Sequence, residues 1–115
     1  MDVTDKLNMT MLCDFYELTM GNGYFEAGLQ NRITYFDVFF REIPDHGGSA
    51  ICAGLDRIID YILDLHFSEE DVAYLRSKKL FSERFLEYLR NFRFTVDIWA
   101  IPEGTPIFTQ EPVIT

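Results

Sequence analysis

The sequence has few of the residues that build metal sites and disulfides. Its 115 residues include two cysteines and two histidines. Cys13 and Cys52 form no CxxC pair and no Cys/His ligand pattern, which argues against a zinc site or a disulfide framework. His46 and His66 likewise have no ligand partner at useful spacing. We therefore expect two buried free thiols and no metal site made from this chain alone.

Positive charge and long apolar runs are also scarce. The chain has 10 Lys and Arg residues against 19 Asp and Glu, a formal net charge of −9. This balance argues against nucleic acid or an anionic membrane as a partner, since both require a basic patch. No apolar run approaches the roughly 20 residues that span a bilayer. The sequence therefore predicts a soluble, cytoplasmic protein.

Apolar and aromatic residues are plentiful. Hydrophobic residues make up 48% and aromatic residues 16% of the chain, including eleven Phe and six Tyr. That is enough apolar material for one domain with one core at this length. The rings exceed what a small core usually needs, so we expect some of them to serve an interface or a ligand site.

The apolar pattern predicts helices followed by strands. Helices are expected at about 10–27 and 50–65, from Ser68 to about Arg76 behind a capping box, and from a cap at Ser82. Alternation predicts strands at 32–41 and 92–101 and shorter extended pieces at 106–109 and 112–115. Turns are expected at 44–48 and 102–104.

This order of elements predicts an α+β domain over residues 1–115, with helices packed on a small mixed or antiparallel sheet. A complete α/β barrel of about 250 residues does not fit in the chain. The sequence ends inside an apolar strand pattern, so we interpret it as the leading piece of a longer polypeptide, incomplete at its C-terminal end.

Three residues of the first helix are candidate ligand contacts. Tyr16 can stack on a flat heteroaromatic ring, although a partly buried helix residue is the simpler interpretation. Asp14 can accept hydrogen bonds from a ligand or orient an arginine, but a carboxylate near a helix start commonly caps free N–H groups. Thr19 can position a ligand or simply bond to its own preceding turn.

Arg41 is a candidate phosphate contact. It ends the first predicted strand, beside Gly47-Gly48 and the predicted start of the 50–65 helix. There a guanidinium can bind phosphate bidentately and helix N–H groups can assist. The alternative is a solvated arginine at a strand end.

Five ordered segments resemble the N-terminal domain of nicotinate phosphoribosyltransferases, a family of type II phosphoribosyltransferases. They are NMTMLCDFYELTMGNGYF, FDVFFRE, AGLDRIIDYI, YLRNFRFTVDIWAIPEGT and EPVIT. The resemblance implies an enzyme that joins nicotinate to 5-phosphoribosyl 1-pyrophosphate, with Mg²⁺ and ATP hydrolysis, to give nicotinate mononucleotide and pyrophosphate in NAD salvage. It also implies an α/β barrel, absent from this chain, and an active site shared across a homodimer.

The resemblance implies roles for individual residues. Tyr16 would reach across the dimer interface to stack on the pyridine ring, Asp14 would help order that site, and Arg41 would contact phosphate of the ribosyl donor. The phosphorylated histidine expected in the family has no match at His46 or His66, and no catalytic or metal-binding residue is assigned. Cys13 stands where the family pattern usually has threonine.

Two alternatives stay open from the sequence. The chain can be a non-catalytic oligomerisation or interaction domain whose surplus rings form an interface. It can also belong to a relative that uses nicotinamide or quinolinate, which keeps the reaction and changes the base. For the enzyme, we expect this 115-residue piece to be inactive without its barrel.

Overall fold

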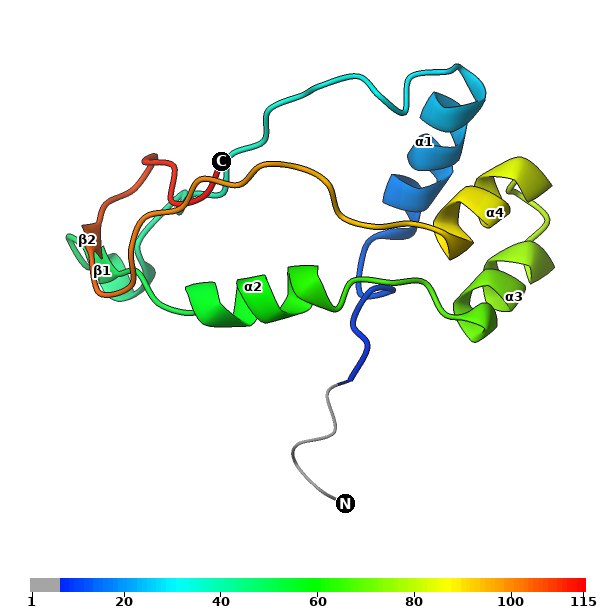
Figure 1. Ribbon diagram of the computed structural model, residues 1–115. Coiled ribbons are helices and arrows are strands. Elements are labelled where there is room, and N and C mark those ends of the chain that lie inside the picture. Colours follow the sequence, from blue (N-terminus) through cyan, green and yellow to red (C-terminus); the bar gives the residue numbers. More distant parts are fainter. Residues whose placement is uncertain (1–6) are drawn as a thin grey trace. The chain divides into compact units, whose positions relative to one another are not determined.

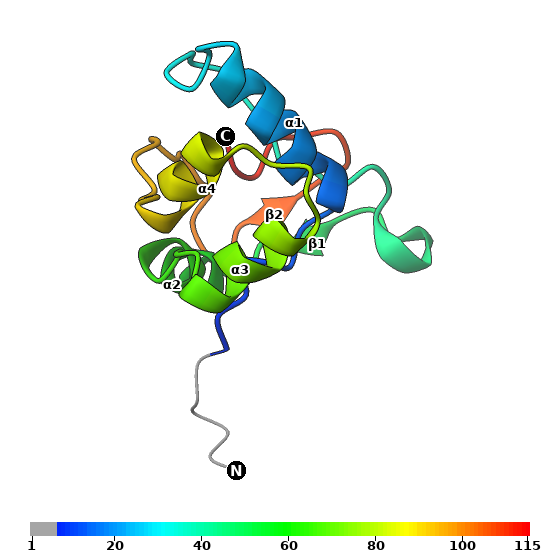
Figure 2. The same ribbon diagram turned by 90° about the vertical axis from the view of Figure 1, so that its right-hand side faces the viewer.

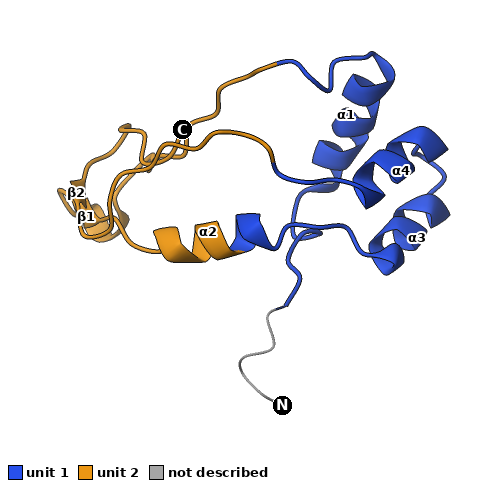
Figure 3. Cartoon of the chain, in the orientation of Figure 1, with its two compact units in different colours: residues 1–32, 61–94 blue, residues 33–60, 95–115 orange. Residues whose placement is uncertain are grey.

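The computed structural model describes residues 7–115, which divide into two compact units (Figures 1 and 3). The helical unit comprises the chain up to residue 32 together with residues 61–94. The strand unit comprises residues 33–60 and 95–115. Helix α2, Leu55–Leu63, includes the point between residues 60 and 61 where the chain passes from the strand unit to the helical unit.

The helical unit is built from α1 (Phe15–Glu26), α3 (Glu69–Ser77) and α4 (Glu83–Arg90). Helix α4 contacts both α3 and α1 and lies beside each of them in Figures 1 and 2. Its apolar face meets theirs in one core cluster, since residues at i, i+3 and i+4 share a helix face. The buried members of that cluster are Leu18, Val72, Leu75, Phe85, Leu86 and Leu89.

The starts of α3 and α4 confirm the capping signals in the sequence. The Ser68 hydroxyl accepts from Asp71 N–H at 3.1 Å, and the Asp71 carboxylate accepts from Ser68 N–H at 2.8 Å, which completes the capping box. The Ser82 hydroxyl accepts from Phe85 N–H at 3.1 Å. Local sequence is sufficient here because all the partners lie within one turn.

Helix α1 begins later than its apolar pattern predicts, at Phe15 rather than near residue 10. The segment before Phe15 makes contacts outside the helix. The hydroxyl of the buried Thr10 accepts a hydrogen bond from His66 N–H at 3.2 Å. Asn8 Nδ2 also donates to the His66 carbonyl at 3.1 Å. These contacts span more than 50 residues, so the helical period of residues 10–14 does not reveal them.

The strand unit contains the short antiparallel pair β1 (Ala50–Ile51) and β2 (Pro106–Ile107), with a 3-10 turn at Pro44–His46. Ile114 forms single antiparallel bridges to both Val38 and Ala100. The buried apolar residues of this unit are Ile43, Ile107 and Val113. Together with the four α-helices found in residues 7–115, this small sheet confirms the α+β class predicted from the sequence.

The two long predicted strands, 32–41 and 92–101, are wrong as continuous strands. Within the described chain, residues 33–37 and 95–98 have no ladder partner, and pairing is confined to the single bridges on Ile114. Alternating side chains make a backbone suitable for a strand, but a strand also needs a neighbour to accept and donate its hydrogen bonds. The predicted turn at 102–104 is confirmed, with Gly104 at φ +79°.

Helix α2 begins at Leu55, so the prediction of a helix from residue 50 is wrong at its start. Ala50 and Ile51 pair with β2 instead, and Gly54 takes φ +100°, where a side chain would be strained. Glu103 then caps the helix from a distant part of the chain. Its Oε1 accepts from Gly54 N–H at 2.8 Å and from Leu55 N–H at 2.6 Å.

We expect Glu103→Ala to lower the free energy of unfolding by about 1 kcal/mol, because it leaves the first N–H groups of α2 uncapped. Glu103→Gln should retain most of that stability, since its amide oxygen can still accept. Urea denaturation followed by circular dichroism measures both changes. Glu111→Ala, at an exposed carboxylate in the same unit, is the matched control, and an equal midpoint for the two alanine variants would contradict the capping role.

Candidate functional site

The structure places Asp14, Tyr16 and Thr19 at the start of α1, in the helical unit. Arg41 belongs to the strand unit, just before the Pro44–His46 turn. Asp14 is the N-cap of α1, and Tyr16 and Thr19 belong to the helix itself, whereas Arg41 lies in an irregular segment.

Asp14 occupies the N-cap position of α1 with extended backbone angles, φ −70° and ψ 140°. Its carbonyl accepts from Glu17 N–H at 3.1 Å, but its carboxylate accepts no capping hydrogen bond. Asp14 therefore stands at the N-cap position, but its side chain does not cap the helix. The exposed carboxylate remains available to accept from another group.

Tyr16 presents its ring to solvent, with 59% of the residue exposed. Among the described residues, its ring stacks on no other aromatic and its hydroxyl has no hydrogen-bond partner. Met20 and Tyr24 follow at i+4 and i+8 and are 47% and 51% exposed. Because residues four apart share a helix face, these three side chains form an exposed apolar row on α1.

Thr19 bonds to its own preceding turn, as the second interpretation of the sequence expects. Its hydroxyl donates to the Tyr16 carbonyl at 3.1 Å, which is the back-bond expected of a threonine inside a helix. The hydroxyl hydrogen is therefore already used. Thr19 can meet a ligand only through the lone pairs of its oxygen.

The opposite side of α1 is fixed to the helical unit. Leu18 is buried in the core cluster, and Asn22 Oδ1 accepts from Ser82 N–H at 3.0 Å. Ser82 Oγ donates to Glu26 Oε1 at 2.6 Å. These polar contacts join residues 60 and 56 positions apart, so the local sequence predicts Ser82 only as a cap. They hold the helix that carries Tyr16 in one orientation.

Cys13 is exposed, so the prediction that both thiols are buried is wrong; Cys52 is half-buried. Partial desolvation and the nearby charges of Glu17 and Asp14 raise the pKa of the Cys13 thiol. Desolvation, Cys13 and Glu17 also raise the pKa of Tyr61. Both groups therefore stay neutral at neutral pH, and Cys13 is poorly suited to act as a nucleophile there.

Arg41 is exposed, and among the described residues its guanidinium forms no ion pair or hydrogen bond. Its side chain is therefore free to bind an anion. The helix start predicted beside Arg41 is wrong, because β1 lies between Gly47-Gly48 and α2. Glu103 accepts from Gly54 N–H and Leu55 N–H, so these two groups are already used. A phosphate at this place would depend on the guanidinium itself.

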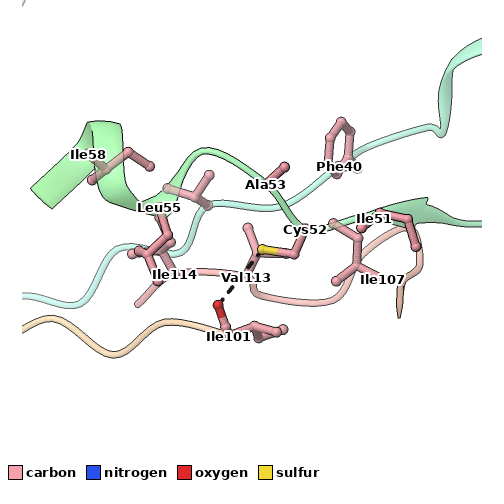
Figure 4. A pocket seen from close by; sticks show the side chains of 11 residues that line it. Phe40, Ile51, Cys52, Ala53, Leu55, Ile58, Ile101, Ile107, Val113 and Ile114 are labelled. Atoms are coloured by element: carbon pink, nitrogen blue, oxygen red, sulfur yellow. Dashed lines mark hydrogen bonds between the residues drawn. The ribbon is translucent and has the colours of Figure 1, made fainter. Parts of the chain in front are cut away.

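An apolar hollow of about 210 Å³ lies within the strand unit (Figure 4). Its lining includes Phe40, Leu55 and Ile107, and the Cys52 thiol in its wall donates to the Ile101 carbonyl at 3.8 Å. No charged side chain lines it. A carboxylate or phosphate ligand would lose its hydration there without compensation, so this hollow does not suit an anionic substrate.

The described residues also bear on metal and membrane binding. Residues 7–115 contain no group of three or more His, Cys, Asp or Glu side chains that could hold a metal ion. Within the same range, no helix has the length and apolar character needed to cross a bilayer.

Comparisons with known proteins agree with the resemblance read from the five segments. Residues 11–115 match the family model described as the nicotinate phosphoribosyltransferase N-terminal domain. A nicotinate phosphoribosyltransferase of Mycobacterium tuberculosis is 38% identical over 104 residues, covering 90% of this chain and 22% of its own length. Those of Caenorhabditis elegans and Bacillus subtilis are 34% and 32% identical, covering 100% and 93% of this chain.

The chain spans about a fifth of the length of these relatives, 21% to 22%. The match covers both compact units and every candidate residue from Asp14 to Arg41. The chain therefore belongs to the nicotinate phosphoribosyltransferase family, in which it corresponds to the N-terminal domain.

Proposed function

We propose that this chain is the N-terminal part of an enzyme that transfers a phosphoribosyl group to nicotinate. The full reaction joins nicotinate to 5-phosphoribosyl 1-pyrophosphate with ATP hydrolysis, giving nicotinate mononucleotide and pyrophosphate in NAD salvage. Membership of the family supports this reaction class. The observation that carries the proposal on the chain itself is Tyr16, an exposed ring on a helix whose other side is fixed to the core.

Tyr16 orients the base in this proposal. A phenol ring gives a flat heteroaromatic ligand an offset-stacking surface, and its free hydroxyl can bond at the rim of that ligand. Because no described aromatic ring or hydrogen-bond partner engages the side chain, ligand binding displaces no internal contact of these kinds. The anchoring of α1 through Leu18 and Asn22 lowers the entropy cost of positioning the base.

Arg41 binds phosphate of the ribosyl donor. Departure of pyrophosphate leaves positive charge on the ribose and negative charge on the leaving group, so catalysis requires alignment and charge neutralisation. An exposed guanidinium that forms no ion pair with any residue of 7–115 can supply part of that neutralisation. Asp14 does not face the nicotinate carboxylate, since two close carboxylates repel; it accepts from another group at the site.

The active site is shared between two copies of the protein in this proposal. The exposed row of Tyr16, Met20 and Tyr24 supports it, since apolar side chains on a helix surface gain free energy when a partner covers them. The same row also fits the alternative, a non-catalytic oligomerisation or interaction domain. The two functions differ in whether the full-length protein turns over substrate.

Mg²⁺, ATP and a cytoplasmic location, which the sequence and the resemblance imply, complete the proposal for the whole protein. No residue of 7–115 is assigned to Mg²⁺ or ATP in this proposal. The described side chains form no group of three or more His, Cys, Asp or Glu residues that could hold a metal ion.

A turnover assay tests the function. We expect the full-length protein, given nicotinate, 5-phosphoribosyl 1-pyrophosphate, Mg²⁺ and ATP, to form nicotinate mononucleotide, and the 115-residue piece to form none. Competition with nicotinamide and quinolinate identifies the preferred base. Turnover by the piece alone would refute its dependence on the missing parts, and an inactive but folded full-length protein would favour the interaction domain.

A further inference from the structure

We propose that Gln110 is a positioning residue that holds Arg41 in place for the phosphate of the ribosyl donor. This inference rests on the proposed function of Arg41 and adds a second residue to it. The two residues are 69 positions apart in the chain and meet within the strand unit.

Two hydrogen bonds join Gln110 to the backbone at Arg41. The Gln110 N–H donates to the Phe40 carbonyl at 2.8 Å, and its side-chain Nε2 donates to the Arg41 carbonyl at 3.3 Å. The two bonds act on consecutive peptide groups. They therefore restrain the backbone from which the Arg41 side chain extends, while leaving its guanidinium free.

Gln110 makes these bonds from an unfavourable backbone conformation. Its φ is +63°, a left-handed value that suits glycine better than a residue with a side chain. Asp45 and His46, in the turn that follows Arg41, also have positive φ, at 58° and 55°. Such conformations persist only where surrounding contacts over-determine them, and they gather at ligand-binding segments.

The turn after Arg41 is also held by a buried side chain, Ile43. Ile43 is 9% exposed, and its Cγ2 would lie 3.1 Å from a Cβ added at Gly47, so the turn closes tightly on this side chain. The segment that carries Arg41 is therefore held both by the burial of Ile43 and by the two hydrogen bonds from Gln110. A guanidinium on a restrained backbone loses less freedom when it binds phosphate, which lowers the cost of binding.

The variant Gln110→Gly, made in the full-length protein, tests the hydrogen bond of the side chain without adding backbone strain. Glycine accepts φ +63° readily and keeps the backbone N–H, so the variant retains the donor of the bond to the Phe40 carbonyl and loses the bond to the Arg41 carbonyl. We expect the KM for 5-phosphoribosyl 1-pyrophosphate to rise about threefold to tenfold, the effect of one hydrogen bond, with the KM for nicotinate unchanged. Glu111→Ala, next in the chain and exposed, is the matched control and should change neither KM by more than about twofold.

Arg41→Ala should raise the donor KM at least about tenfold, and adding Gln110→Gly to it should have no further effect, since the two residues act as a unit. Full additivity, an equal rise in both KM values, or an unchanged donor KM in Gln110→Gly would overturn the positioning role while leaving the reaction standing. An unchanged donor KM in Arg41→Ala would overturn the roles of both residues. A wild-type protein that makes no mononucleotide would instead overturn the proposed function on which both rest.

Discussion

Tyr16→Ala in the full-length protein should raise the KM for nicotinate about 5-fold to 150-fold, because stacking of an aromatic side chain on a base contributes roughly 1–3 kcal/mol. The KM for 5-phosphoribosyl 1-pyrophosphate should change little. The structure argues against a folding defect as the cause, since Tyr16 is 59% exposed and lies outside the core cluster. Initial rates at varied nicotinate and saturating donor measure the effect.

Two further variants sharpen this result. Tyr16→Phe keeps the ring and should retain most of the affinity for nicotinate, which separates stacking from the hydroxyl bond. Tyr24→Ala removes a similarly exposed ring two turns further along α1. It shows whether loss of any exposed ring on this helix surface, rather than loss of stacking on the base, changes the KM. Equal KM values for wild type and Tyr16→Ala would remove Tyr16 from the site, and equal effects of the two alanine variants would indicate a general interface role.

Leu75→Ala should lower the free energy of unfolding by about 3–5 kcal/mol, a large share of the 5–15 kcal/mol that typical domains have. Leu75 is 0% exposed on α3 and belongs to the cluster that joins α1, α3 and α4. Truncation there removes apolar contacts and leaves a cavity. Urea denaturation followed by circular dichroism at a helix wavelength measures the loss.

Leu80→Ala provides the control, since the same atoms are removed at a residue that is 60% exposed just after α3. We expect it to cost less than about 1 kcal/mol. Trp99, the single tryptophan, lies in the strand unit and reports on that unit through its fluorescence. If Leu75→Ala costs no more than Leu80→Ala, Leu75 is not part of a packed core between α1, α3 and α4.

The helical unit could be predicted from the sequence to a large extent. The capping signals at Ser68 and Ser82 predicted the starts of α3 and α4. These features depend on partners one turn away, so a short stretch of sequence contains the whole interaction.

The candidate site was predicted only in part. Tyr16 and Arg41 were singled out by chemical type and by the family resemblance, and their availability follows from exposure that the sequence does not state. Gln110 went unnoticed because its partner lies 69 residues earlier. No spacing rule links residues at that separation; only the folded chain brings them within hydrogen-bond distance.

By itself, the sequence determined the family, the α+β class and the helix starts that depend on local caps. The tertiary structure alone decided that residues 32–41 and 92–101 pair only at single bridges, that Cys13 is exposed, and that Glu103 caps α2. The physical reason is the range of the interactions. Helical hydrogen bonds and caps close within a few residues, whereas strand pairing, burial and distant caps depend on which remote segments the fold brings together.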